Sequence, residues 1–363
     1  MNKNKLIILT ILFCFSVSSY SSIVKFKVEK AASGLGIPWG MSVISNTELV
    51  FTERGGKVGI LNVDTGEYYY LQGVPDIFLQ GQGGLLDVAK PKNYHEGWLY
   101  FTYVKPINGN GATTLARAKI IKKKLVEWQD LLVSDSVTDT DRHFGSRIAF
   151  SDKHVFFSIG DRGIRPNSQD LKTHSGSIIR LNMDGTVPED NPFIKNNNGH
   201  GEIFSYGHRN PQGLFWDNNH EKLWSIEHGP RGGDEINLIK SGGNYGWPVI
   251  SYGKEYWSPF AVGEGTSKKG MEQPVKHYVP SIAPSSLIIY NGKAFPEWQG
   301  SILAGALKMQ HINIVKLSDS FEAIKETRIL NHLNERVRAL TQDNEGRVYF
   351  STDSGNIYVI KPE

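Results

Sequence analysis

The sequence predicts an all-β fold, specifically a six-bladed β-propeller of four-stranded antiparallel blades. Helical patterns are scarce, glycine (38) and proline (16) are abundant, and short runs of β-branched and aromatic residues alternate with Gly, Asn and Asp turns. A sequence repeat with the pattern strand–turn–strand–turn–strand, called here the repeated phrase, also recurs about six times along the chain, which is typical of propellers. A tandem of sandwiches is the alternative, but a sandwich rarely repeats one phrase six times.

The N-terminal residues are predicted to be a secretion signal rather than part of the fold. Two lysines precede an apolar stretch at 6–17, of about 12 residues, which is too short to span a bilayer well. Small residues follow at 18–22, as expected at a cleavage site. We therefore expect residues 1–22 to be a signal peptide, residues 23–363 to form one propeller domain, and the mature protein to be exported to the periplasm.

Charge and cysteine content exclude several classes of function. The formal net charge is +3, and no stripe of Lys and Arg is interleaved with aromatic residues, so we expect no nucleic-acid partner. The only cysteine, Cys14, lies within the predicted signal, and the preceding Phe13 argues against a lipoprotein. We therefore expect a mature chain without disulfides and without a membrane span.

The repeated phrase can be followed from the first blade to the last. Its first, third and last copies have predicted strands at 40–43, 48–52, 57–61, 146–150, 155–159, 177–181, 337–340, 348–352 and 356–360. Other copies begin near Gly84, Gln212 and Ser286, with loops of uneven length inserted between strands. A propeller gathers its functional loops at one end of a central channel, so residues far apart in the sequence can converge there.

Two residues of the third copy are candidates for acid–base chemistry. His143 precedes the first strand of this copy, and Asp161 ends the second strand. A histidine at the channel mouth can act as a general base near neutral pH, and a neighbouring carboxylate can orient its ring. Each residue taken alone also has an ordinary interpretation, as a surface histidine and as an aspartate that forms a turn.

Basic residues at equivalent ends of the predicted strands suggest an anion-binding pocket. Arg209 is followed by Asn210 within the glycine-bounded segment 207–213, and such a pair suits a carboxylate or quinone oxygen. Lys308, Arg336 and Arg338 fall at comparable positions in later copies. If these cations converge, they form a pocket for a small polyanion, whereas each one alone could equally be a salt-bridged surface residue or brace a loop.

The segment 227–237 is a tight, acidic, glycine-rich loop. Bent backbone carbonyls and nearby carboxylates are hard oxygen ligands, which calcium prefers. The spacing is not that of an EF-hand, and the sequence contains no zinc-type cluster of cysteine and histidine. We therefore expect that any metal bound in this loop is calcium.

These motifs together resemble the soluble aldose sugar dehydrogenases that depend on pyrroloquinoline quinone (PQQ), a family of six-bladed propellers related to glucose/sorbosone dehydrogenase. The resemblance spans nearly the whole mature chain. The matching segments are 81–86, 143–147, 207–213, 228–237, 243–248, 283–286, 307–308 and 336–338.

The resemblance implies a sugar-oxidising enzyme in which an aldose loses hydride from its anomeric carbon to PQQ and leaves as a lactone. His143 is the implied base for the anomeric hydroxyl, Asp161 holds His143, and Arg209 stabilises the oxyanion that develops on the quinone. An electron acceptor of unidentified chemistry is implied as a partner. The residues implied to hold PQQ are Gln82, Arg209, Asn210, Tyr256, Lys308, Arg336 and Arg338.

Calcium is the second implied cofactor. The backbone carbonyls of Gly229 and Pro230 are implied to hold a calcium ion that polarises the quinone. Glu235 and Tyr245 resemble the ligands of a further, structural calcium ion.

The sequence departs from glucose-oxidising members of the family on the sugar-facing side. Arg142 replaces an aspartate, and Val279 replaces a tryptophan, while Asp87 matches relatives with a broader substrate range. A broad aldose preference is therefore expected. Two alternatives are a propeller that only binds a partner and a calcium-dependent lactonase, which would need acidic calcium ligands around the channel and no clamp for a polyanion.

Overall fold

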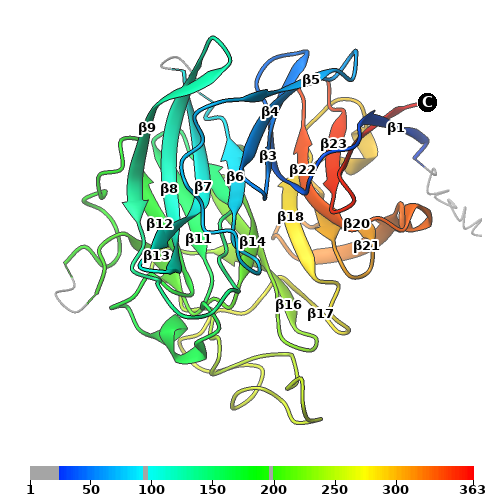
Figure 1. The fold of residues 1–363 in the computed structure, drawn as a ribbon. Coiled ribbons are helices and arrows are strands. Elements are labelled where there is room, and N and C mark those ends of the chain that lie inside the picture. Colours follow the sequence, from blue (N-terminus) through cyan, green and yellow to red (C-terminus); the bar gives the residue numbers. More distant parts are fainter. Residues whose placement is uncertain (1–23, 93–96, 196–198) are drawn as a thin grey trace, which may run out of the picture.

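The computed structural model describes residues 24–92, 97–195 and 199–363, so the predicted signal peptide lies outside the described residues. The described strands form six four-stranded antiparallel sheets arranged as the blades of a propeller (Figure 1). This confirms the predicted fold class. Blade 1 contains β2 (Pro38–Val43), β3 (Glu48–Glu53), β4 (Lys57–Asn62) and β5 (Tyr68–Leu71), and blade 2 contains β6 (Leu85–Ala89), β7 (Trp98–Ile107), β8 (Asn110–Ile121) and β9 (Lys124–Val133).

The remaining blades follow the same order from the channel outward. Blade 3 contains β10 (Ile148–Phe150), β11 (His154–Ile159), β12 (Ser177–Asn182) and β13 (Ile203–Tyr206), and blade 4 contains β14 (Pro211–Asp217), β15 (Lys222–Glu227), β16 (Asp234–Ile239) and β17 (Lys276–Tyr278). Blade 5 contains β18 (Pro284–Ile289), β19 (Ile302–Ala306), β20 (His311–Leu317) and β21 (Ala323–Ile329), and blade 6 contains β22 (Val337–Gln342), β23 (Val348–Thr352), β24 (Asn356–Pro362) and β1 (Phe26–Ala32).

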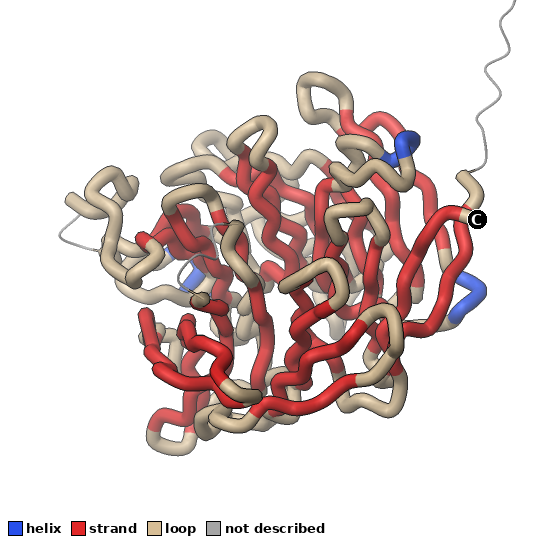
Figure 2. Tube along the Cα trace, turned by 90° about the horizontal axis from the view of Figure 1, so that it is seen from above, coloured by secondary structure: helices blue, strands red, loops and turns tan. Residues whose placement is uncertain are grey.

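The described chain is helical only in short 3₁₀ turns, as Figure 2 shows. These turns are η2 (Arg165–Gln169), η3 (Pro296–Trp298) and η4 (Asn331–Leu333). Among the described residues, no helix is long and apolar enough to cross a membrane.

The ring closes through both its inner strands and its N-terminus. The innermost strands contact one another in the order β2, β6, β10, β14, β18 and β22, and β22 contacts β2 again. At the outer edge, β1 pairs antiparallel with β24, so the N-terminal segment completes the blade that the C-terminal strands begin. The sequence repeat predicts the three strands of this blade from the C-terminal segment, but it gives no sign of the fourth.

The burial pattern follows from how blades stack face to face. All five residues of β23 are buried, because a strand in the middle of a blade is covered on both sides by neighbouring blades. The outermost strand β21 contains only partly buried and exposed residues, as expected for a strand at the outer edge of a blade that meets solvent. Apolar clusters fill the spaces between adjacent blades, and one of them joins Leu303 of blade 5 to Phe350 of blade 6.

Arg147, directly before β10, fills the centre of the ring. It is 6 % exposed and forms an ion pair with Asp87 on β6, with 2.8 Å between Nη1 and Oδ1. It also donates hydrogen bonds to backbone carbonyls on the innermost strands of the other four blades. The acceptors are Trp39 O (3.5 Å), Gln212 O (3.0 Å), Ser285 O (3.1 Å) and Arg338 O (3.5 Å).

Candidate active site

A cavity of about 290 Å³ lies at the mouth of the channel, and all six blades contribute to its wall. Among the residues predicted to bind a cofactor, Gln82, Asn210, Arg336 and Arg338 line it. Three residues whose backbone carbonyls accept hydrogen bonds from Arg147 (Trp39, Gln212 and Arg338) also line the cavity. Arg147 therefore lies against the inner end of the cavity.

His143 and Asp161 form the predicted pair beside this cavity. The His143 Nδ1 and Asp161 Oδ1 atoms are 2.6 Å apart. The backbone N–H of His143 donates to Gln82 Oε1 at 2.8 Å, which anchors the histidine to the cavity wall. His143 has a φ of 56°, a left-handed conformation that is uncommon for a non-glycine residue and is often found at functional sites.

Asp161 is fixed by three donors from separate segments. Its Oδ1 also accepts from the Gly163 N–H at 2.7 Å, and its Oδ2 accepts from the Trp247 indole N–H at 2.8 Å. A carboxylate held in this way accepts the Nδ1 proton of the imidazole and leaves Nε2 with a free lone pair. The geometry therefore produces an oriented imidazole that can accept a proton.

The surroundings keep His143 neutral and Asp161 ionised. Burial lowers the pKa of His143, and the positive charges of Arg209 and Arg142 lower it further, against the opposing hydrogen bond to Asp161. Burial opposes ionisation of Asp161, but the hydrogen bond from His143 and the charge of Arg209 outweigh it and keep the pKa of this carboxyl below its usual value. A neutral imidazole beside a carboxylate is the form that a general base requires.

Arg209 lies between the cavity and the acidic loop. Its Nη1 donates to the carbonyls of His228 (3.2 Å) and Gly229 (2.8 Å), and its guanidinium lies 5.3 Å from the centre of the Trp247 ring. The Nε atom of Arg209 is buried and has no hydrogen-bond partner among the described residues. A buried donor without an acceptor is costly, so this atom fits a site that receives an oxygen from a ligand.

Arg336 and Arg338 meet on one carboxylate at the opposite wall. Arg336 Nε donates to Asp353 Oδ2 at 2.8 Å, and Arg338 Nε donates to Asp353 Oδ1 at 2.8 Å. A register shift in the pairing of β22 lies between Val337 and Ala339, so the two arginines do not lie on a regular strand. Asp353 nevertheless aligns both guanidinium groups at the cavity.

The pKa of His228 reflects the positive charge at this site. His228 lines the cavity. Burial, together with the charges of Arg209 and Arg338, lowers its pKa to about 3 against the opposing hydrogen bond to Pro284 O. Two of the four cations that the sequence predicts to converge, Arg209 and Arg338, therefore act on one point of the channel mouth.

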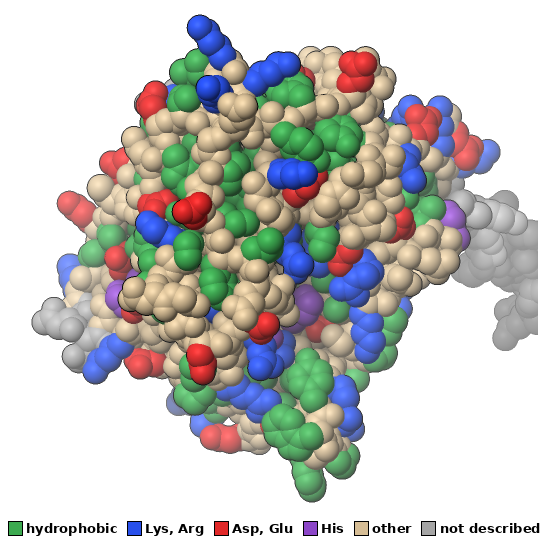
Figure 3. Space-filling view, in the orientation of Figure 1, with side chains coloured by type: hydrophobic (Ala, Val, Ile, Leu, Met, Phe, Trp, Pro, Cys, Tyr) green, Lys and Arg blue, Asp and Glu red, His purple; other side chains and the backbone are tan. Residues whose placement is uncertain are grey.

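The structure places two predicted cofactor residues at the rim. Lys308 is exposed and is not part of the cavity wall, although the adjacent Leu307 is. Tyr256 is 61 % exposed, and its hydroxyl lies 3.5 Å from Arg209 Nη2. Tyr256 belongs to the long β16–β17 connection, which forms the projecting lobe with apolar side chains at the bottom of Figure 3.

The four predicted calcium ligands surround one small void. Gly229, Pro230, Glu235 and Tyr245 all line a space of about 10 Å³, although the sequence resemblance implied two separate ions. Burial and the charge of the neighbouring Glu227 raise the pKa of Glu235 to about 8. Repulsion between two carboxylates that share one such site favours binding of a metal ion there.

The tyrosine in this void has its hydroxyl already in use. The Tyr245 hydroxyl donates to Leu238 O at 2.7 Å and accepts from Lys240 N at 2.9 Å. Only the backbone carbonyl of Tyr245 is therefore suited to a metal ion. Gly229 is equally constrained, because an added Cβ would lie 2.1 Å from Gly233 O.

Three supporting residues are absent from the sequence-based site. Trp247 holds Asp161, Arg147 lies against the inner end of the cavity, and Asp234 fastens the acidic loop. The Asp234 carboxylate accepts from the backbone N–H groups of Gly229 (2.9 Å) and Ala283 (2.9 Å). Their positions within the matching segments 143–147, 228–237 and 243–248 are the only sequence signal for them.

Comparison with known proteins gives matches along most of the chain. The sequence model of the family described as Glucose / Sorbosone dehydrogenase matches residues 35–360. Aldose sugar dehydrogenase YliI of Escherichia coli K12 is 34 % identical over 362 residues, which cover 97 % of each chain.

Two solved structures extend this comparison to the fold. The apo-form of the soluble aldose sugar dehydrogenase of Escherichia coli superposes with a TM-score of 0.89 at 32 % identity, covering 93 % of this chain and 100 % of that chain. The PQQ-bound form of aldose sugar dehydrogenase from Streptomyces coelicolor gives a TM-score of 0.77 at 25 % identity, covering 93 % and 99 % of the two chains.

Proposed function

The chain belongs to the Glucose / Sorbosone dehydrogenase family and is an oxidoreductase, and we propose that it oxidises aldose sugars at the anomeric carbon to lactones with PQQ as cofactor. One observation carries this proposal. A cavity lined by three arginines (Arg54, Arg336 and Arg338) lies beside the His143 imidazole, which is 12 % exposed and which Asp161 orients as a base. A cavity with these features suits a polyanionic redox cofactor and a hydroxyl-bearing substrate.

His143 is the proposed general base. With Nδ1–H donated to Asp161, its Nε2 lone pair is available to accept the proton of the anomeric hydroxyl. Asp161 then stabilises the imidazolium that results, without itself taking the proton. Trp247 and Gly163 keep the carboxylate in place during this transfer.

The residues around the cavity fit PQQ, which carries three carboxylates. Arg336 and Arg338 supply cations at one wall, while Gln82 and Asn210 supply amides, with Lys308 and Tyr256 at the rim. The unpartnered Nε of Arg209 suits an oxygen on which negative charge develops. When bound, the quinone supplies the acceptor for the two electrons of the sugar.

The small void beside Arg209 is the proposed calcium site. Glu235, the carbonyls of Gly229 and Pro230, and the carbonyl of Tyr245 provide hard oxygen ligands. In addition, the buried Oδ1 of Asn237 accepts no hydrogen bond among the described residues, and the same side chain donates to Glu227 and Glu235. A divalent cation would neutralise this acidic group and hold the loop next to Arg209.

The substrate preference is proposed to be broad. Val279 is 64 % exposed and packs against Gly232, so it offers no large aromatic surface to one particular sugar. Arg142 places a positive charge near His143.

We propose residues 23–363 as one exported catalytic domain that follows a signal peptide at 1–22. Cell fractionation and N-terminal sequencing of the mature protein will test this proposal.

The decisive experiment reconstitutes the purified apoprotein. We expect oxidation of several aldoses, with an artificial electron acceptor, only when PQQ and Ca²⁺ are both added. Sugar oxidation that persists without PQQ would refute the mechanism. Hydrolysis of a lactone by the protein with Ca²⁺ alone would favour a lactonase, and PQQ-independent binding of a protein without turnover would favour a binding module.

A titration tests the cofactor site independently of turnover. Arg338→Gln removes one charged donor from the cavity, and hydrogen bonds to charged groups are worth enough to weaken PQQ binding about 10- to 100-fold. Arg328→Gln on β21 is the matched control, because Arg328 is half exposed and pairs with Glu326 away from the cavity. Equal PQQ affinity in the two variants would place the cofactor elsewhere.

A further inference from the structure

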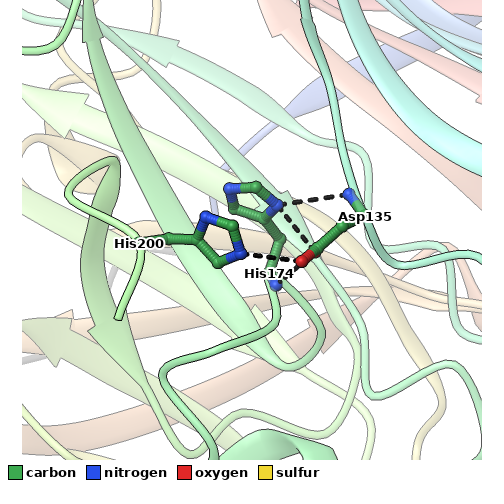
Figure 4. A group of neighbouring side chains, drawn as sticks. All are labelled: Asp135, His174 and His200. Carbon is green, nitrogen blue, oxygen red and sulfur yellow. Dashed lines mark hydrogen bonds and ion pairs between the residues drawn. The ribbon is translucent and has the colours of Figure 1, made fainter. Parts of the chain in front are cut away.

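Three loops of blade 3 bring two histidines and two carboxylates together outside the cavity. Asp135 belongs to the β9–β10 connection, His174 to the loop before β12, and His200 and Glu202 to the loop before β13. Figure 4 shows Asp135 at one edge of the two imidazole rings. None of these residues lines the cavity or the void of the proposed active site, so the proposed function gives them no role.

One edge of each ring is bound to Asp135. His174 Nδ1 lies 2.8 Å from Asp135 Oδ1, and His200 Nε2 lies 2.7 Å from Asp135 Oδ2. Contacts this short to a carboxylate require a proton on the ring nitrogen, since a lone pair there would repel the carboxylate. The backbone N–H of Asp135 also points to His174 Nδ1, at 3.2 Å, but the shorter contact with the carboxylate oxygen decides the assignment.

The opposite edges of the two rings face Glu202. His174 Nε2 and His200 Nδ1 lie 3.9 Å and 3.8 Å from the same oxygen, Glu202 Oε2. His174 is 3 % exposed, and its Nε2 has no hydrogen-bond partner among the described residues. Neither distance is that of a hydrogen bond, so two ring nitrogens and a carboxylate oxygen converge here without direct bonds. The negative charges of Asp135 and Glu202 at the same point favour a cation among these three atoms.

We propose that His174 Nε2, His200 Nδ1 and the Glu202 carboxylate bind a divalent transition-metal ion of the zinc type, with Asp135 as the outer carboxylate that orients both imidazoles. Two imidazoles and one carboxylate match the ligand preference of zinc and do not match that of calcium or magnesium. An outer carboxylate that binds the second nitrogen of a ligating histidine is the usual support of such sites.

The site needs only a small adjustment to close around an ion. Bonds of about 2.0–2.1 Å in a tetrahedral arrangement place ligand atoms about 3.4 Å apart, slightly closer than the 3.8 and 3.9 Å observed. The two rings stack with centroids 3.9 Å apart at 25°, so one ring must turn toward the ion. The side chain of His200 is 30 % exposed and has the room to do so, which leaves a fourth position for water.

A metal ion here would cross-link three loops that also meet through hydrogen bonds and through the stacked imidazole rings. The loop that carries His174 follows η2, whose Arg165 binds Glu255 in the β16–β17 connection at 2.7 Å. The ion is therefore expected to stiffen the face of blade 3 next to the proposed active site. Its effect should appear in stability even when no sugar, PQQ or turnover is involved.

Zinc binding by tag-free protein, first treated with a chelator, tests this proposal. Titration with ZnSO₄ in saturating CaCl₂, which fills any oxygen-ligand site, is expected to show one bound zinc per chain and a higher thermal unfolding midpoint. Cobalt in place of zinc is expected to give the visible d–d bands of a tetrahedral nitrogen and oxygen site. A wild-type protein that binds no zinc under these conditions would overturn the proposal, whatever the outcome of the sugar assays.

Variants locate the ion. His200→Ala and Glu202→Gln are expected to weaken zinc binding at least tenfold, and Asp135→Asn, which disturbs only the outer carboxylate, by about 10- to 100-fold. His332→Ala in η4 is the control, because His332 is exposed and lies outside the cluster. Zinc affinity that is equal in His200→Ala, Glu202→Gln and His332→Ala would show that the ion binds elsewhere. His200 is in an outer loop, so this variant is expected to fold.

Discussion

His143 has neighbours that act in opposite directions on its protonation. Burial and two nearby arginines disfavour the imidazolium, whereas the hydrogen bond to Asp161 favours it. The balance keeps the ring neutral near pH 7 but leaves a carboxylate in contact to stabilise the proton once it arrives. A base of this kind is unprotonated at the start of the reaction and is still basic enough to hold the proton that it receives.

Replacing the imidazole tests its role directly. His143→Ala is expected to retain PQQ binding and to reduce kcat by about 10²- to 10⁴-fold, the usual contribution of a general base. Quinone titration and steady-state rates measure the two effects separately, with His332→Ala as control. Unchanged turnover would remove His143 as the base.

The pH profile gives a second test at the same residue. The base must be unprotonated, and the pKa of His143 is lowered from 6.5, so kcat/KM is expected to fall only as pH drops below that value. Asp161 raises this pKa through its hydrogen bond and charge. Asp161→Asn is therefore expected to move the acidic limb to lower pH and to lower the plateau. An unchanged limb would mean that another group controls the profile.

Sequence reasoning finds the His143–Asp161 pair because both residues flank neighbouring strands of one blade. Sequence reasoning does not identify Trp247 and Arg147, because their hydrogen-bond partners lie as far as 86 and 191 residues away, respectively, in other blades. No local spacing encodes such contacts, and only closure of the ring brings them together. The exposed position of Lys308 likewise depends on how its loop turns at the rim.

At the scale of elements, the closing strand β1 is the least evident in the sequence. The repeated phrase predicts strands that are joined to their neighbours by short turns, as β22, β23 and β24 are. β1 is separated from its blade by the rest of the propeller, so pairing with β24 cannot be inferred from adjacent residues. The pairing unites the two ends of the chain, and we expect it to contribute to stability out of proportion to its length.

Two substitutions in β1 test this expectation. Val28 packs against the apolar cluster between blades 5 and 6, so Val28→Asp is expected to lower the free energy of unfolding by about 1–3 kcal/mol through burial of an unpaired polar group. Lys27→Ala, on the exposed face of the same strand, is expected to change it by less than about 0.5 kcal/mol. Thermal unfolding with and without urea measures both, and equal effects would contradict a stabilising role for this face.

At the scale of the whole molecule, Arg147 connects blade 3 to the innermost strands of all five other blades. Its ion pair with Asp87 is buried, and the remaining bonds satisfy carbonyls that point into the channel. A single planar group with five donors can serve several acceptors at once, which a lysine cannot do. One central residue therefore joins all six blades, in addition to the contacts between neighbouring blades.

Replacing Arg147 is expected to lower the stability of the entire propeller. Arg147→Met leaves the buried Asp87 without its charged partner, although the Ile148 N–H still donates to it, and loss of one partner of a buried ion pair typically costs about 3–5 kcal/mol. The double variant Arg147→Met with Asp87→Leu is expected to recover part of this loss, because no uncompensated charge remains. Calorimetry of both variants measures the difference. A double variant less stable than Arg147→Met alone would show that Asp87 acts independently of the arginine.

Arg147 also affects how ligands reach the cavity. Because its guanidinium lies at the centre of the ring and is bonded to the inner strands, we expect ligands to enter the channel from the cavity end only. In the proposed reaction the sugar, the lactone and the electron acceptor would then use the same opening of the channel at different times. This shared access would separate the proposed chemistry into two successive half-reactions.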